Sequence, residues 1–140
     1  MVTIDFDREL APAGNDAWQA LENVQLRTPF KEPITIRFSS RVYTFNKRVD
    51  VRRLLDLQGE GFTSQIRLVG TVLYFPNSGG FLTHFPGTFD AEPASGSLFM
   101  LRNMTILGEG KGIGIEAQNR LHASDLWIER FHGGIFIRGE

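Results

Sequence analysis

The chain has 140 residues, a formal net charge of −1 and no cysteine. These values exclude disulfides and thiolate chemistry, and they give no electrostatic reason to expect binding to nucleic acid or to an anionic membrane. No apolar run is long enough to cross a membrane, and no signal peptide is visible at the N-terminus. The length suits a single domain with a modest core.

The first part of the chain predicts one short helix. Residues 1–14 are polar and end in Ala-Pro-Ala-Gly, so we expect an extended lead-in. Residues 15–33 then predict a capping helix and its connection. Asp16 is a good N-cap residue, Trp18 and Leu21 follow on one helical face, and two prolines close the segment.

From residue 34 onward the pattern is that of strands. Apolar and polar residues alternate in short runs that are separated by Gly, Pro or polar turns. These runs lie at residues 34–38, 42–45, 54–57, 66–69 and 72–75. A stretch rich in Gly, Pro and Ser between the last of these runs and residue 98 predicts a protruding loop, at 86–96.

The end of the chain holds two copies of one pattern. Residues 101–106 align with 123–128, and residues 112–116 align with 134–138, both at an offset of 22 residues. A fixed internal period indicates stacked units that share one core. We therefore predict an all-β fold, a right-handed single-stranded parallel β-helix over residues 34–140. It would have about five coils of about 22 residues and one short N-terminal capping helix.

Three segments, in this order, resemble motifs of the pectate-lyase superfamily. Residues 16–21, DAWQAL, are similar to the helix that opens these domains. Residues 34–43, ITIRFSSRVY, resemble the strand that follows, and residues 55–66 resemble its glycine-containing turn. The strand departs from the family pattern at Ser39 and Arg41, which replace a proline and a glycine.

The resemblance implies a β-helix that acts on extended polysaccharides outside the cell or on a virion. The expected function is a polysaccharide-recognising domain, as part of a polysaccharide lyase, a glycoside hydrolase or a bacteriophage tailspike depolymerase. The alternative is a non-catalytic structural or oligomerisation module of a phage tail or surface assembly. The repeat pattern stops without a cap, so we expect a C-terminal continuation or a homo-oligomer, a trimer as in many phage members, to cover this end.

Trp127 is the main candidate for contact with a sugar. An outward indole is a flat apolar platform on which a sugar ring could stack, and Arg130, His132 and Arg138 complete the expected substrate-binding set. The alternative is that Trp127 packs under a loop or against another subunit, because large aromatic side chains are usually mostly buried.

The candidate catalytic groups lie close to Trp127 in the sequence. Asp125 and Glu129 could supply the two carboxylates that glycoside hydrolysis needs, and Arg130 or Arg138 could supply the cation of a lyase. A structural role is the alternative for both acids. Asp125 takes the place of Asn103 in the repeat, where Asn and Asp commonly bond to the backbone of a turn. Glu129 would then lie on a solvated face.

No metal or cofactor is expected. The three histidines lack the spacing of a zinc site. Asp56, Glu60 and Asp90 could contribute oxygens to calcium, but the calcium-loop pattern of EF-hands is absent.

Overall fold

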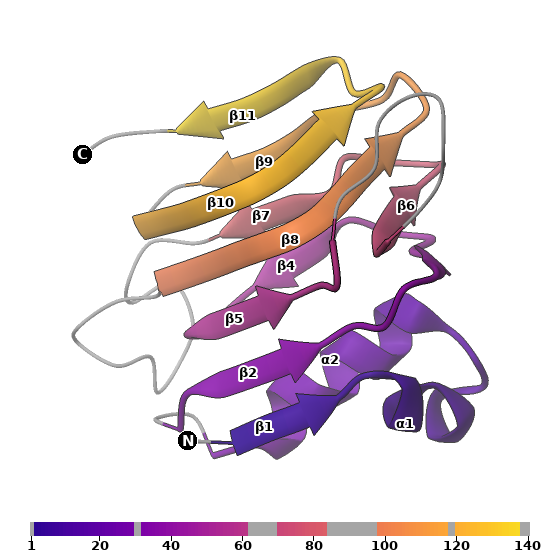
Figure 1. The fold of residues 1–140 in the computed structure, drawn as a ribbon, viewed down its shortest axis with the longest axis vertical. Coiled ribbons are helices and arrows are strands. Elements are labelled where there is room, and N and C mark those ends of the chain that lie inside the picture. The colour runs from indigo at the N-terminus through magenta and orange to yellow at the C-terminus, as the bar shows by residue number, and fades with distance from the viewer. Residues whose placement is uncertain (1, 30–31, 62–69, 84–97, 118–119, 138–140) are drawn as a thin grey trace.

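The computed structural model describes residues 2–29, 32–61, 70–83, 98–117 and 120–137. In these residues the strands form two sheets with parallel pairing throughout, a seven-stranded sheet A and a four-stranded sheet B (Figure 1). Sheet A contains β1 (Val2–Asp5), β2 (Ile34–Arg37), β3 (Val42–Thr44), β5 (Leu55–Gln58), β6 (Val72–Phe75), β8 (Leu98–Gly108) and β10 (Arg120–Glu129). Sheet B contains β4 (Val49–Val51), β7 (Phe81–Thr83), β9 (Ile113–Ala117) and β11 (Gly133–Ile137).

The prediction of an all-β solenoid with regular 22-residue coils is wrong. The fold is mixed, with two curled parallel sheets and the helices α1 (Asp7–Leu10) and α2 (Ala17–Arg27). The spacing between paired strands is not constant. It is 32 residues from Val2 to Ile34, 21 from Ile34 to Leu55, and 44 from Leu55 to Phe99. The 22-residue period read from the end of the chain therefore does not extend to the rest.

Sheet A curls because β8 has two different neighbours. Its first half pairs with β5, and its second half pairs with β6. Between the halves, Asn103 has a left-handed backbone with φ 58°, and Asp125 repeats this bend in β10 with φ 52°. Asn and Asp tolerate this conformation better than most residues. We call β1, β2, β5 and the first halves of β8 and β10 the first limb of sheet A.

The repeat at the end of the chain is present in part. β10 lies on β8 at the predicted offset of 22 residues, with Ala123 opposite Leu101, which confirms the first half of the alignment. The second half is wrong by two residues, because Ile135 lies opposite Ile115 at an offset of 20. Fewer residues connect β10 to β11 than connect β8 to β9. A shift of two residues keeps the same side chains on each face, so the apolar pattern could not reveal it.

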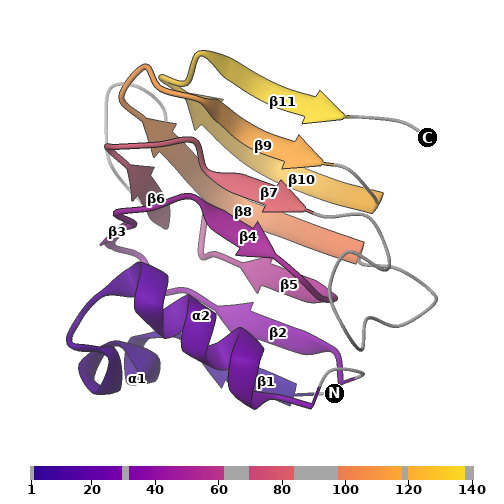
Figure 2. The same ribbon diagram turned by 180° about the vertical axis from the view of Figure 1, so that it is seen from behind.

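The N-terminal segment is more structured than expected. Residues 1–14 were expected to be an extended lead-in, but they include β1, α1 and the 3-10 helix Ala11–Ala13. The expected helix forms as α2, and the Asp16 carboxylate accepts a hydrogen bond from the Gln19 backbone N–H at 3.1 Å. Figures 1 and 2 show α2 across the end of the sheets farthest from β10 and β11. Ala20, Leu21 and Val24 of α2 are buried there.

Most predicted strands are confirmed, and β1, β4 and β7 were missed. β2, β3, β5 and β6 correspond to the runs at 34–38, 42–45, 54–57 and 72–75. β4 and β7 were not predicted, and each has only three residues. The run at 66–69 and the loop at 86–96 lie outside the described residues.

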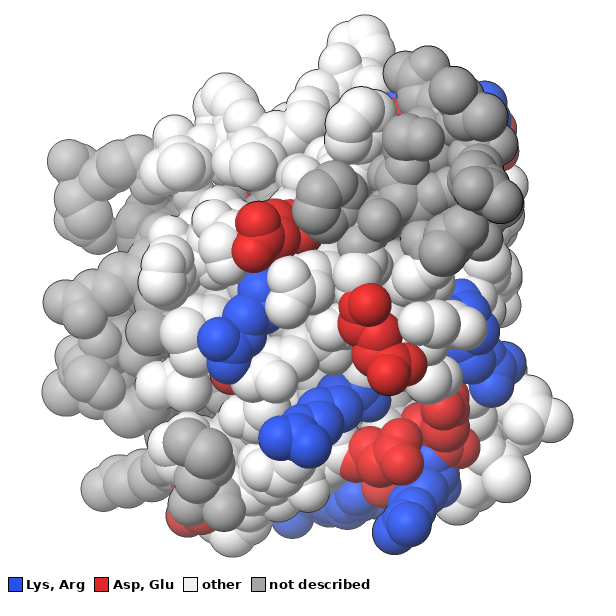
Figure 3. Space-filling view, in the orientation of Figure 1, with Lys and Arg blue, Asp and Glu red and all other residues white. Residues whose placement is uncertain are grey.

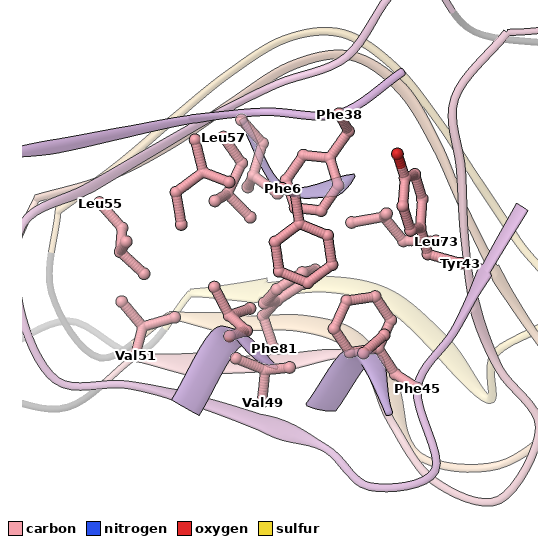
Figure 4. Close-up of a cluster of buried hydrophobic side chains, with 14 of the residues drawn as sticks. Phe6, Phe38, Tyr43, Phe45, Val49, Val51, Leu55, Leu57, Leu73 and Phe81 are labelled. Carbon is pink, nitrogen blue, oxygen red and sulfur yellow. The ribbon is translucent and has the colours of Figure 1, made fainter. Parts of the chain in front are cut away.

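Aromatic side chains fill much of the core between the sheets. Figure 4 shows Phe6, Phe38, Tyr43, Phe45 and Phe81 turned toward the same interior from different elements. The ring centroids of Phe6 and Phe38 are 4.6 Å apart, and Phe75 lies 5.0 Å from Phe45 and 5.4 Å from Phe81. Such pairs add packing energy beyond the burial of apolar area.

Arg53 forms hydrogen bonds that hold the C-terminal end of α2 in place. Its side chain is only 1% exposed, although arginine is rarely buried. The guanidinium donates hydrogen bonds to the carbonyl oxygens of Gln25, Thr28 and Pro29, at 2.6 to 3.1 Å, and also to that of Glu32. Burial lowers the pKa of Arg53 from its usual value, with a smaller opposite effect from Glu32. One fork-shaped cation thus satisfies four backbone carbonyls where the helix ends.

Candidate functional site

Polar side chains line the outer face of the first limb in rows. Ile34, Ile36, Leu55 and Leu57 belong to the core, so the residues between and after them point to the opposite face. The strand register places Asp5, Arg37, Gln58, Arg102 and Ser124 opposite one another on five successive strands. We call these five residues the polar row. Four strand spacings of about 4.8 Å give it a length of about 19 Å.

An open cavity of about 700 Å³ begins at one end of this row. It lies where β1, β2 and β5 end and where α1 begins. Acidic and basic side chains gather over this part of the molecule (Figure 3). Its polar lining has four carboxylates, two guanidiniums, two hydroxyls and an amide, from Asp5, Asp7, Glu9, Glu60, Arg8, Arg37, Thr3, Ser39 and Gln58.

Several of these groups are held in place by neighbours. Glu60 accepts a hydrogen bond from the Ser40 backbone N–H at 2.7 Å, and Glu9 accepts one from Arg27 at 2.6 Å. Arg37 is exposed, and among the described residues it forms no ion pair. The cavity therefore combines fixed acceptors with a guanidinium that can bind a ligand.

Asp7 anchors α1 to the sheet beside the cavity. Its carboxylate accepts hydrogen bonds from the Tyr43 hydroxyl at 2.6 Å and the Ser39 hydroxyl at 2.7 Å. Arg41 lies 3.5 Å from the same carboxylate and 5.0 Å from the centre of the Tyr43 ring. The cluster joins the start of α1 to residues 39–43, which are distant from it in sequence.

The same contacts move the pKa values of the cluster away from neutral pH. Burial raises the pKa of Asp7, but the hydrogen bonds from Tyr43 and Ser39 and the charge of Arg41 outweigh it, so the pKa is lowered overall. Burial and the hydrogen bond to Asp7 raise the pKa of Tyr43 to about 12. Neither group is suited to exchange protons near neutral pH, which favours an anchoring role over general acid–base catalysis.

We predict that Tyr43 ionises late in an alkaline titration. The chain has two tyrosines, so tyrosinate absorbance can be assigned with Tyr43→Phe. The wild type should show a step near pH 12, and the variant should lack it. Because the folded pKa lies above the ordinary value of 10.0, the contribution of Tyr43 to stability is present below pH 10 and is lost as the pH rises toward 12. A step at the ordinary pH for both residues would contradict the buried hydrogen bond.

Trp127 is on the outer side of the second half of β10. Leu126 and Ile128 pack against the core, so the indole between them points away from it. The side chain is nevertheless half-buried, and its Nε1–H is shielded from solvent without a hydrogen-bond partner. Trp127 is therefore not an open platform in this structure.

The other predicted site residues in the described part of the chain lie along β10 and in the turn that follows it. Arg130 and His132 are exposed in the turn before β11, and neither lines a described cavity. Glu129 ends β10, and Asp125 lies at the bend of β10 beside a separate hollow of about 400 Å³. Arg138 lies outside the described residues.

Comparison with known proteins does not assign the chain to a family. It matches no protein-family model, no curated protein and no solved structure. Within the described residues there is no cluster of three or more metal-binding side chains. The helices in that part of the chain are too short or too polar to cross a membrane.

The sequence contained a partial signal for the cavity residues. Alternation in the runs at 34–38 and 54–57 places Arg37 and Gln58 on the outer face, but it does not show that the two strands are neighbours. Asp5 and Asp7 lie in the segment that was expected to be an extended lead-in. They could have been found only by recognising β1 as a strand.

Proposed function

We propose that the cavity and the polar row bind a polysaccharide. The observation that carries this proposal is the mixed lining of the cavity, in which carboxylates, guanidiniums, hydroxyls and an amide lie side by side. Sugar hydroxyls both donate and accept hydrogen bonds, so they match such a lining. Four carboxylates against two arginines disfavour nucleic acid, whose binding depends on neutralising phosphates.

The length of the polar row supports an extended ligand. The row continues from the cavity through Arg102 on β8 to Ser124 on β10. Its length of about 19 Å, from strand spacing alone, exceeds what a single sugar ring needs. A ligand of this kind fits the extracellular or virion-associated location expected from the sequence.

The test is binding of the chain to a panel of neutral and acidic polysaccharides, measured by calorimetry. Arg37→Met should weaken binding at least tenfold, because a hydrogen bond to a charged group contributes about 1.5–3 kcal/mol. Arg48→Met is the matched control. Arg48 pairs with Asp50 at 3.2 Å and lies outside the cavity lining, so its loss should leave the affinity unchanged.

Two results would contradict the proposal. One is the absence of binding to every polysaccharide in the panel. The other is an equal effect of Arg37→Met and Arg48→Met. Release of reducing or unsaturated ends from the same panel would show whether the chain also cleaves its ligand as a hydrolase or a lyase.

A second candidate function, a structural assembly module, is favoured by a different observation. β11 is the edge strand of sheet B, and Ile135, Phe136 and Ile137 are 48%, 46% and 64% exposed. The adjacent hollow of about 400 Å³ is partly lined by Leu126 and Ile128. An exposed apolar edge strand readily pairs with another chain. Because α2 covers the opposite end, a second copy would meet the same surface about a two-fold axis.

Light scattering tests this assembly. We expect the wild type to form dimers and Ile137→Lys to be monomeric, because a charge on the edge strand opposes pairing. Leu26→Lys is the control, since Leu26 is 68% exposed on α2, far from β11. A monomeric wild type, or loss of the dimer in both variants, would contradict the assembly.

A further inference from the structure

Asp56 is a buried carboxylate in which one oxygen has no hydrogen-bond partner. It lies on β5 between Leu55 and Leu57, which are in the core, so its side chain is on the outer face of the first limb. The side chain is 9% exposed. Oδ2 accepts hydrogen bonds from Gln58 Nε2 at 2.9 Å and from Arg102 Nη2 at 3.2 Å. Oδ1 is shielded from solvent and has no hydrogen-bond partner.

An oxygen in this state is unusual in a folded protein. Nearly all buried polar atoms have a partner, because removing them from water without one is costly. The cost is greater for a carboxylate than for a neutral group. β5 is paired with β2 on one side and with β8 on the other, so the neighbouring backbone is engaged in the sheet and a ligand can supply the missing donor.

Asp56 is well placed for a ligand on the polar row. Gln58, two residues further along β5, lines the cavity and is hydrogen-bonded to Asp56. Arg102 is also in the row, and its side chain is 49% exposed. The Arg102 side of this ion pair is half-exposed, so solvent weakens its charge and a ligand can reach and displace the guanidinium. Displacement would leave Oδ2 bonded to Gln58 alone, and the carboxylate would then be short of donors for a ligand to supply.

We propose that Asp56 selects the ligand at this point of the row by accepting a hydrogen bond from a sugar hydroxyl at Oδ1. The ligand unit there is neutral and hydroxylated, because a uronate carboxylate would be repelled by Asp56. Arg102, which is bonded to Oδ2, is the partner that the ligand displaces. The inference rests on the proposed function and narrows its ligand to a neutral polysaccharide.

The experiment compares wild type, Asp56→Asn and Arg102→Met for binding to a neutral glucan and to a polyuronate. Asp56→Asn keeps the shape of the side chain and removes the charge. We expect it to weaken binding of the neutral glucan tenfold or more. Arg102→Met should bind the neutral glucan more tightly than the wild type, because the ligand no longer has to displace the guanidinium from Asp56. Thermal unfolding of each variant shows that it is folded.

Three outcomes separate this inference from the proposed function. Unchanged binding of the neutral glucan by Asp56→Asn would overturn the role of Asp56 alone. Binding of the polyuronate only, with loss in Arg102→Met, would keep the polysaccharide site and overturn the neutral ligand. Absence of binding to either polymer by the wild type would overturn both the inference and the proposed function.

Discussion

Arg53→Met is expected to destabilise the chain by about 3–5 kcal/mol, because several carbonyls lose their donor, at about 1–3 kcal/mol for each one left buried. The substitution keeps a long apolar side chain and removes every donor. The carbonyls of Gln25, Thr28 and Pro29 would lose their hydrogen bonds from the guanidinium. Because whole domains are stable by only about 5–15 kcal/mol, this loss should be plain in urea unfolding.

Arg48→Met is the control for this prediction. Arg48 is 45% exposed and pairs with Asp50 on the surface, so its loss should change the free energy of unfolding by about 0–1 kcal/mol. Arg53→Lys keeps the charge but has no fork, and it should fall between the two. Equal midpoints for Arg53→Met and Arg48→Met would show that the buried guanidinium does not hold α2 in place.

Phe75→Ala is expected to cost about 3–5 kcal/mol as well, for a different reason. Phe75 is fully buried, with its ring 5.0 Å from Phe45 and 5.4 Å from Phe81. Removing the ring leaves a cavity between the two sheets. The surrounding strands are paired on both sides and cannot collapse into it fully.

The control is Leu26→Ala on α2. Leu26 is 68% exposed, so its loss should change stability by about 0.5 kcal/mol or less. Calorimetric unfolding of both variants makes the comparison. An equal loss of stability in the two variants would contradict the packing role of Phe75.

The sequence predicted local structure better than architecture. Alternation located β2, β3, β5 and β6, and the capping residue Asp16 located α2. Architecture depends on which strands are neighbours, and pairing distances of 21 to 44 residues leave no mark in local alternation. The 22-residue period holds between β8 and β10. The prediction applied the same period to the earlier strands, which do not follow it.

The candidate site was harder to predict for the same reason. Trp127 and Arg130 were predicted to bind a sugar because they stand out within a clear repeat. Neither lines a described cavity. Asp5, Arg37 and Gln58 are ordinary surface residues in the sequence. They form a row only because β1, β2 and β5 are adjacent.

The position of β8 between β5 and β6 also bears on how fast the chain folds. β8 forms by closing two long connections together, since Leu55 pairs with Phe99 and Val72 pairs with Thr105. Closure of long loops is entropically costly, and folds dominated by distant contacts fold slowly. Neither half of sheet A is complete until β8 has paired with β5 and β6. We therefore expect docking of β8 to be the rate-limiting step of folding, and we expect the two halves of the sheet to fold cooperatively.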